Sequence, residues 1–138
     1  MQIIKNVWVN GCFDVLHRGH LELFKFAKSQ GDHLVVGIDS DSRVRESKGE
    51  SRPFNNQEDR KFFLECIKYV DRVVVFNNDS ELRTKISINE IDYLIVGSDW
   101  KGKEIIGGEL VEEVKYFKRI GNYSTTKILE KKWNMYST

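Results

Sequence analysis

The sequence predicts an α/β fold in which a parallel sheet lies between two layers of helices. Apolar, β-branched segments alternate with amphipathic segments along all 138 residues. The segments 34–38 and 73–76 are apolar almost without interruption, which is typical of strands buried on both faces. Strands that alternate with helices form parallel sheets through right-handed crossovers. We therefore expect a three-layer α/β/α sandwich.

Five strands are expected, and turn-forming residues follow four of them. Asn10 and Gly11 follow the first, Asp39 the second, the segment 77–80 the third and Gly97 the fourth. Such a series fits a Rossmann-like sheet, in which ligands bind beyond the carboxyl ends of the strands. The expected strands are 7–9, 34–38, 73–76, 93–96 and 115–117.

The expected helices are bounded by capping and stop residues. Gly31 ends the first helix, Asn56 caps the second, and residue 124 or 125 caps the last. The second helix carries an apolar stripe that includes Phe62 and Phe63. The polar segment 40–56 holds the single proline and is expected to be a long loop. The expected helices are 20–30, 57–69, 81–88, 108–113 and 124–132.

Composition indicates one small cytoplasmic domain spanning residues 1–138. Lys and Arg total 22 and Asp and Glu total 21, a net charge of +1 that argues against a nucleic-acid binder. No apolar run approaches the roughly 18 residues of a membrane span, so no membrane partner is expected. Two cysteines are too few for a disulfide framework, which favours reduced thiols in the cytoplasm.

Two histidines with a glycine between them follow the first strand. His17 and His20 are three residues apart, so a helix beginning there places both imidazoles on one face. A helix N-terminus favours anions, and Gly19 leaves room for a phosphate to approach. The competing interpretations are a capping residue beside a surface histidine, or a metal site shared with Cys12 that lacks a fourth ligand.

The segment 11–20 resembles the His-x-Gly-His loop of the nucleotidyltransferase superfamily that includes the cytidylyltransferases. The segment 123–127, Tyr-Ser-Thr-Thr-Lys, resembles the second signature of that superfamily, which enters the last helix. The two motifs lie in the expected order at the two ends of one domain, so the resemblance covers nearly the whole chain.

Within the superfamily the chain resembles two substrate classes. Segments 47–53, 58–60 and 107–111 are similar to the adenylyltransferase domain that makes ADP-heptose. Segment 97–103 and Arg119 instead resemble glycerol-3-phosphate cytidylyltransferase. Residues 120–123 depart from the cytidylyltransferase motif, and Val96 stands where the heptose enzymes have a lysine.

The resemblance implies a role for each matching residue. His17 and His20 would bind phosphates and stabilise the pentavalent transition state, with Lys48 and Arg119 as the other catalytic residues. The acceptor would contact Asp39 and Arg52. The nucleotide would contact Gly11, Cys12, Phe13, Asp14, Gly19, Arg60, Asp99, Trp100, Tyr123, Ser124, Thr125 and Thr126.

Structural roles compete with several of these assignments. Lys48 and Arg60 could be solvated surface cations, and Asp14 could hold a turn. Trp100 could be an aromatic residue at the edge of the core, and Ser124 an ordinary helix cap. The run of three hydroxyl residues beside Arg119 favours phosphate binding over the cap alone.

The expected activity is transfer of a nucleoside monophosphate to a phosphorylated small molecule, with release of pyrophosphate. CTP is slightly preferred over ATP because residues near the ligand should follow the ligand more closely than the scaffold does. Mg²⁺ should arrive with the nucleotide, and the resemblance implies a homodimer. The alternatives are a heptose 1-phosphate adenylyltransferase and a nucleotide-binding regulatory module without catalysis.

Overall fold

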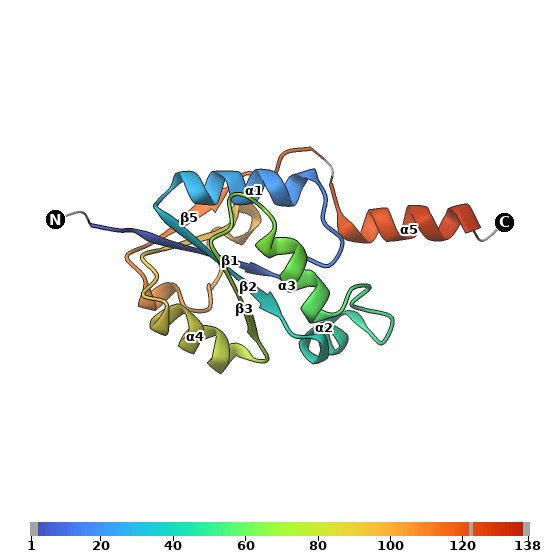
Figure 1. Ribbon diagram of the computed structural model, residues 1–138, viewed down its shortest axis with the longest axis horizontal. Coiled ribbons are helices and arrows are strands. Elements are labelled where there is room, and N and C mark those ends of the chain that lie inside the picture. The colour runs from blue at the N-terminus through green and yellow to red at the C-terminus, as the bar shows by residue number, and fades with distance from the viewer. Residues whose placement is uncertain (1–2, 122, 137–138) are drawn as a thin grey trace.

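A single parallel sheet organises the chain. The structure is a computed structural model that describes residues 3–121 and 123–136. The sheet order is β3-β2-β1-β4-β5, so the order reverses beside β1, the central strand (Figure 1). The strands are β1 (Asn6–Gly11), β2 (His33–Asp39), β3 (Arg72–Phe76), β4 (Tyr93–Gly97) and β5 (Glu113–Phe117). The Rossmann-like α/β fold expected from the sequence is confirmed.

Helices cover both faces of this sheet. Phe24 and Ala27 of α1 and Leu64 of α3 pack against Val7 and Val9 of β1 in one core cluster. Leu82 and Ile86 of α4 pack on the opposite face, in a second cluster that contains Trp8. The α-helices are α1 (Arg18–Ser29), α2 (Asp41–Lys48), α3 (Gln57–Glu65), α4 (Asp79–Ile88) and α5 (Thr125–Tyr136).

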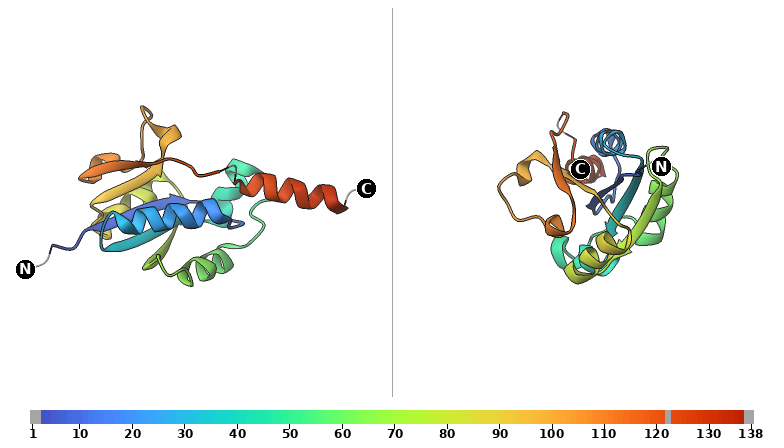
Figure 2. Two further views of the ribbon diagram at one scale, coloured as in Figure 1. Left: turned by 90° about the horizontal axis from the view of Figure 1, so that it is seen from above. Right: turned by 90° about the vertical axis from the view of Figure 1, so that its left-hand side faces the viewer.

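Helix α5 extends away from the carboxyl end of the sheet, whereas the other helices lie against the body of the molecule (Figures 1 and 2). Two short 3₁₀ helices, η1 (Ser98–Trp100) and η2 (Gly108–Leu110), lie between β4 and β5. No helix among the described residues is long and apolar enough to cross a membrane.

Three local expectations are wrong. The segment 40–56 contains α2, which Ser40 caps by accepting a hydrogen bond from the Arg43 amide; Val44 anchors this otherwise polar helix in the core. The second helix ends at Glu65, and its buried face carries Arg60 and Leu64 in place of the expected aromatic stripe. The segment expected to be helical at 108–113 holds only η2, because β5 already begins at Glu113.

Phe62 and Phe63 are exposed as a result, by 63% and 44%. Neighbouring positions on a helix point in directions about 100° apart, so a helix that buries positions 60 and 64 turns 62 away from the core.

Candidate active site

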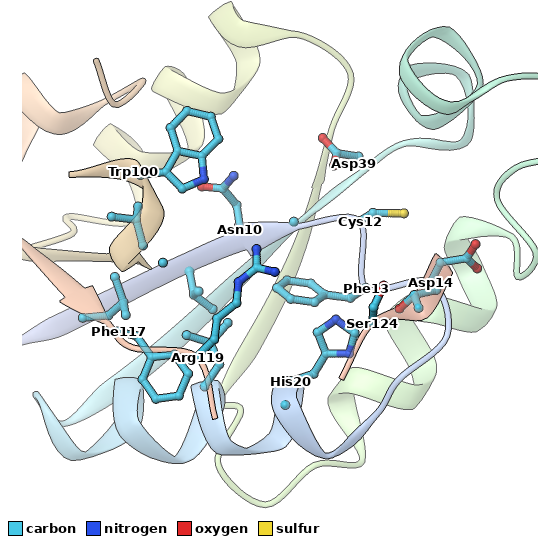
Figure 3. Close-up of a pocket in the computed structure, with 18 of the residues that line it drawn as sticks. Asn10, Cys12, Phe13, Asp14, His20, Asp39, Trp100, Phe117, Arg119 and Ser124 are labelled. Carbon is cyan, nitrogen blue, oxygen red and sulfur yellow. The ribbon is translucent and has the colours of Figure 1, made fainter. Parts of the chain in front are cut away.

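A pocket of about 590 Å³ opens at the carboxyl ends of the strands, beside β1 where the sheet order reverses (Figure 3). It lies where the sequence predicted a ligand. Its lining includes most of the predicted site residues, contributed by segments more than a hundred positions apart: Gly11, Cys12, Phe13, Asp14, His17, Gly19, His20, Asp39, Lys48, Arg52, Trp100, Arg119, Tyr123, Ser124, Thr125 and Thr126.

His20 is held as a neutral hydrogen-bond donor. The backbone N–H of His17 donates to its Nδ1 at 3.2 Å, so Nδ1 carries no proton and Nε2 carries it. Burial, together with the neighbouring His17 and Arg119, lowers the pKa of His20 to about 4. At neutral pH the ring is therefore uncharged and can donate through Nε2.

His17 stacks between two rings at the first turn of α1. Its ring centroid lies 3.8 Å from that of His20 and 5.8 Å from that of Tyr123. Gly19 makes this packing possible, because a Cβ there would come within 2.9 Å of His17 Cε1. Nδ1 of His17 is buried and has no hydrogen-bond partner among residues 3–121 and 123–136. Burial and Arg119 lower the pKa of His17. A ligand atom could satisfy this nitrogen.

The first turn of α5 faces the same pocket. Thr125 Oγ1 donates to the Val15 carbonyl at 2.6 Å, which joins α5 to the loop after β1. Ser124 Oγ accepts from the Lys127 amide at 3.3 Å, so Ser124 is also a helix cap, as the competing interpretation held. Two helix N-termini, of α1 and α5, thus meet at one pocket, and each favours an anion.

Two exposed cations border the pocket. Lys48 is the last residue of α2 and has no ion-pair partner within the described part of the chain. The side chain of Arg119 is 71% exposed and points into the pocket in Figure 3. Its Nη2 lies 3.7 Å from Asp99 Oδ2. Their charges are available to an anionic ligand.

Asp14 and Arg52 are fixed to each other. The buried Asp14 carboxylate accepts from Arg52 Nε at 3.1 Å and from the amides of Phe54 and Asn55 at 2.7 and 2.8 Å. Asn55 Nδ2 returns a hydrogen bond to the Asp14 carbonyl. Asp14 therefore ties the loop after α2 to the loop after β1, and it does so from a position in the pocket lining.

Arg60 does not line the pocket, although the sequence predicted that it binds the nucleotide. Its side chain is fully buried and donates to the carbonyls of Cys12, Asp39 and Asn55 at 2.8–3.0 Å. Nη2 donates to Asp41 Oδ1 at 2.8 Å. The guanidinium is occupied by four acceptors, so it holds the segments that line the pocket.

Asp99 also lies outside the pocket lining, whereas the adjacent Trp100 is 47% exposed within it. Trp100 therefore does not belong to the edge of the core. Cys12 is half-buried, and burial raises the pKa of its thiol, which argues against a nucleophilic role.

Several lining residues were not predicted. Arg43 donates to Asp39 Oδ1 and Asp79 Oδ1, both at 2.8 Å, and it lies in the helix that was expected to be a loop. In the sequence pattern, Asn10 is marked only as the residue after a strand. The apolar lining of Leu82, Ile105 and Ile106 comes from the α4 side of the sheet, and no sequence motif marks it.

No group of three or more His, Cys, Asp or Glu side chains among the described residues is arranged to hold a metal ion. Burial raises the pKa of Asp39, whose charge is partly compensated by Arg43.

Known proteins resemble this chain over nearly its whole length. Residues 8–138 match the family described as cytidylyltransferase-like. Bifunctional protein HldE of Wolinella succinogenes is 45% identical over 127 residues, which cover 92% of this chain and 27% of that protein. HldE of Campylobacter fetus subsp. fetus is 45% identical over 125 residues, covering 91% and 27%.

A solved structure shares the fold. The crystal structure of the lipopolysaccharide core biosynthesis protein from Thermoplasma volcanium GSS1 superposes with a TM-score of 0.71 and 27% sequence identity. The match covers 85% of this chain and 99% of that one. By contrast, the chain spans about a quarter of the length of the HldE relatives.

Proposed function

The chain belongs to the cytidylyltransferase-like family of nucleotidyltransferases, and we propose that it transfers a nucleoside monophosphate to a phosphorylated small molecule. The observation that carries this proposal is the meeting of two helix N-termini and two stacked histidines at one pocket. A nucleoside triphosphate is the anionic ligand that such a double cradle suits.

The proposed reaction needs alignment and charge neutralisation more than covalent chemistry. A phosphate oxygen of the acceptor attacks the α-phosphorus in line, and pyrophosphate leaves with the electrons of the broken P–O bond. The neutral ring of His20 donates from Nε2 to a phosphate oxygen, and the donation strengthens as negative charge develops. Lys48 and Arg119 supply positive charge from the rim, and a Mg²⁺ ion entering with the nucleotide would neutralise further phosphate charge.

The favoured substrates are ATP and a heptose 1-phosphate. Segments 47–53, 58–60 and 107–111 resemble the adenylyltransferase domain that makes ADP-heptose, and the likeness to HldE extends over 92% of the chain. These two resemblances together support ATP with a heptose 1-phosphate over the slight preference for CTP that residues near the pocket suggest. Moreover, Asp99, one of the residues on which that preference depends, lies outside the pocket lining. CTP with a polyol phosphate is the second candidate, because Arg119 and Trp100 do line the pocket.

The test measures pyrophosphate release with ATP, CTP, GTP and UTP, each with heptose 1-phosphate, glycerol 3-phosphate and a small phosphate panel. Release with ATP and the heptose supports the favoured pair, and release with CTP alone selects the second candidate. Tight nucleotide binding without release for any acceptor supports a regulatory module instead.

The first prediction concerns the histidine pair. Replacing His17 with alanine should lower turnover by at least ~100-fold, because a group that contacts the developing charge is lost. His33→Ala is the matched control, since His33 begins β2 and does not line the pocket. Circular dichroism checks that both variants fold. Turnover of the His17 variant within a few-fold of wild type would remove His17 from the mechanism.

We also propose that the active form is a homodimer in the cytoplasm. Phe54, Phe62 and Phe63 are exposed by 59%, 63% and 44%, an aromatic area that a second copy could cover. Light scattering at several concentrations tests this, and a monomer throughout would contradict it.

A further inference from the structure

The pocket has two sides, defined by the alternation of side chains along β1. Val9 points to the face covered by α1, where it packs with Phe24 in the first core cluster. Trp8 points to the opposite face and packs with Leu82 of α4. Asn10 is two positions after Trp8, so it shares that face, and it is exposed in the pocket near Trp100 (Figure 3). The histidines of α1 lie on the other side.

The amide of Asn10 is oriented by a buried indole. Trp8 is completely buried, and its Nε1 donates to Asn10 Oδ1 at 2.9 Å. An indole N–H can only donate, so the atom of Asn10 that faces Trp8 must be the carbonyl oxygen. The Nδ2 group therefore points away from Trp8. Its two N–H donors have no partner within the described residues, and Asn10 is exposed in the pocket.

Gly37 makes the position of the indole possible. Gly37 lies opposite Asn10 on the neighbouring strand β2. A Cβ at Gly37 would come within 2.2 Å of Trp8 Cζ2, a distance that no side chain tolerates. The absent side chain at position 37 thus leaves space for the indole that holds Asn10. Three residues on two strands together fix the direction of one amide.

We propose that Asn10 is a specificity-determining residue that donates a hydrogen bond to an oxygen of the phosphorylated acceptor, and that Trp8 positions it. This inference rests on the proposed function. In the proposed reaction the nucleotide phosphates bind at the N-termini of α1 and α5. Asn10 instead faces the α4 side, where Arg43 pairs with Asp79 of α4 and with Asp39, the residue predicted to contact the acceptor. A pre-oriented group with donors alone selects an oxygen that can accept, and disfavours an analogue with a donor or a methyl group there.

The test titrates heptose 1-phosphate into the full chain saturated with α,β-methylene-ATP, whose α–β linkage is not cleaved. Calorimetry compares wild type with Asn10→Ala, Trp8→Phe and the double variant. Trp8→Phe keeps an aromatic ring in the core, but it removes both the N–H that orients Asn10 and part of a completely buried side chain, so the lost volume needs a control of its own. Val74→Ala is the matched control, because Val74 belongs to the same core cluster but lies on β3. Urea unfolding verifies that each variant is folded at the temperature of the titration.

We expect Asn10→Ala to weaken acceptor binding about tenfold and Trp8→Phe about threefold, with binding of α,β-methylene-ATP within twofold of wild type. In the Asn10→Ala background, Trp8→Phe should have no further effect on acceptor binding, since the amide that it orients is gone. If the role of Trp8 were purely structural, the effects of Trp8→Phe and Asn10→Ala on acceptor affinity would be additive. Val74→Ala would then weaken acceptor binding as well.

Three results would overturn the inference: wild-type acceptor affinity in Asn10→Ala, additive effects in the double variant, or a loss confined to nucleotide binding. These results are distinct from a failure of the proposed function. In that failure, the wild-type chain itself would release no pyrophosphate and bind no acceptor from the panel, which would contradict both.

Discussion

The arginines that build the pocket differ from the cations that border it. Arg60 is 0% exposed and donates to three carbonyls and the Asp41 carboxylate, whereas Arg52 is 13% exposed and donates through Nε to the Asp14 carboxylate. Lys48 and Arg119 are exposed, and within the described residues Arg119 pairs only with Asp99, whose Oδ2 lies 3.7 Å from its Nη2. A cation whose hydrogen bonds are already used stabilises the architecture, whereas an exposed cation retains its charge for a ligand. The distance of a cation from a sequence motif does not show whether it stabilises the architecture or remains available to a ligand.

The largest expected effect is on Arg60. Arg60→Ala leaves three carbonyl oxygens and the Asp41 carboxylate without their donor, and should lower the free energy of unfolding by about 3 kcal/mol. Urea unfolding at neutral pH measures the loss. Lys61→Ala, which removes the next cation on α3, should change stability by less than about 0.5 kcal/mol. Equal stability of the two variants would contradict the structural role of Arg60.

The two exposed cations should behave in the opposite way. Lys48→Ala and Arg119→Ala should each lower kcat/KM for the nucleotide about tenfold to a hundredfold, while the urea midpoint stays at the wild-type value. Arg45→Ala and Lys118→Ala remove neighbouring charges outside the pocket lining and serve as controls. A lower urea midpoint in Lys48→Ala or Arg119→Ala would contradict the division between the two groups of cations. So would a loss of kcat/KM in the control variants equal to the loss in these two.

The smallest effect concerns pH. The pKa of folded His20 is about 4, below its ordinary value of 6.5, so between these values the unfolded chain binds a proton that the folded chain does not. Stability should therefore fall as the pH drops from 6.5 toward 4. Urea midpoints across this range should depend less on pH in His20→Asn than in wild type. An identical pH dependence in both would contradict the neutral, buried state of His20.

The order of strands and helices was predictable because it depends on local patterns. Continuous apolar runs such as 34–38 indicate buried strands whatever they pack against. Helix α2 was missed because seven of its eight residues are polar or charged, and its single buried anchor, Val44, gives no periodicity. The orientation of α3 was missed because its buried face includes an arginine.

The site residues that belong to a sequence motif could be predicted. The roles of residues that depend on contacts between distant segments could not. His17, His20 and the segment 124–126 lie in the pocket as their motifs implied. The structural role of Arg60 depends on carbonyl groups from distant segments, and in the sequence it resembles any helical cation. The orientation of Asn10 depends on a glycine across the sheet, a relation that strand register establishes.

The most direct test of nucleotidyl transfer is ³¹P NMR of the chain with ATP, Mg²⁺ and heptose 1-phosphate. We expect the ATP signals to be replaced by pyrophosphate and by the two coupled resonances of a nucleoside diphosphate ester, because attack occurs at the α-phosphorus. Appearance of ADP, which would place the attack at the γ-phosphorus, would contradict nucleotidyl transfer. Unchanged ATP here, together with unchanged CTP and ATP in parallel samples with every acceptor of the panel, would contradict it as well.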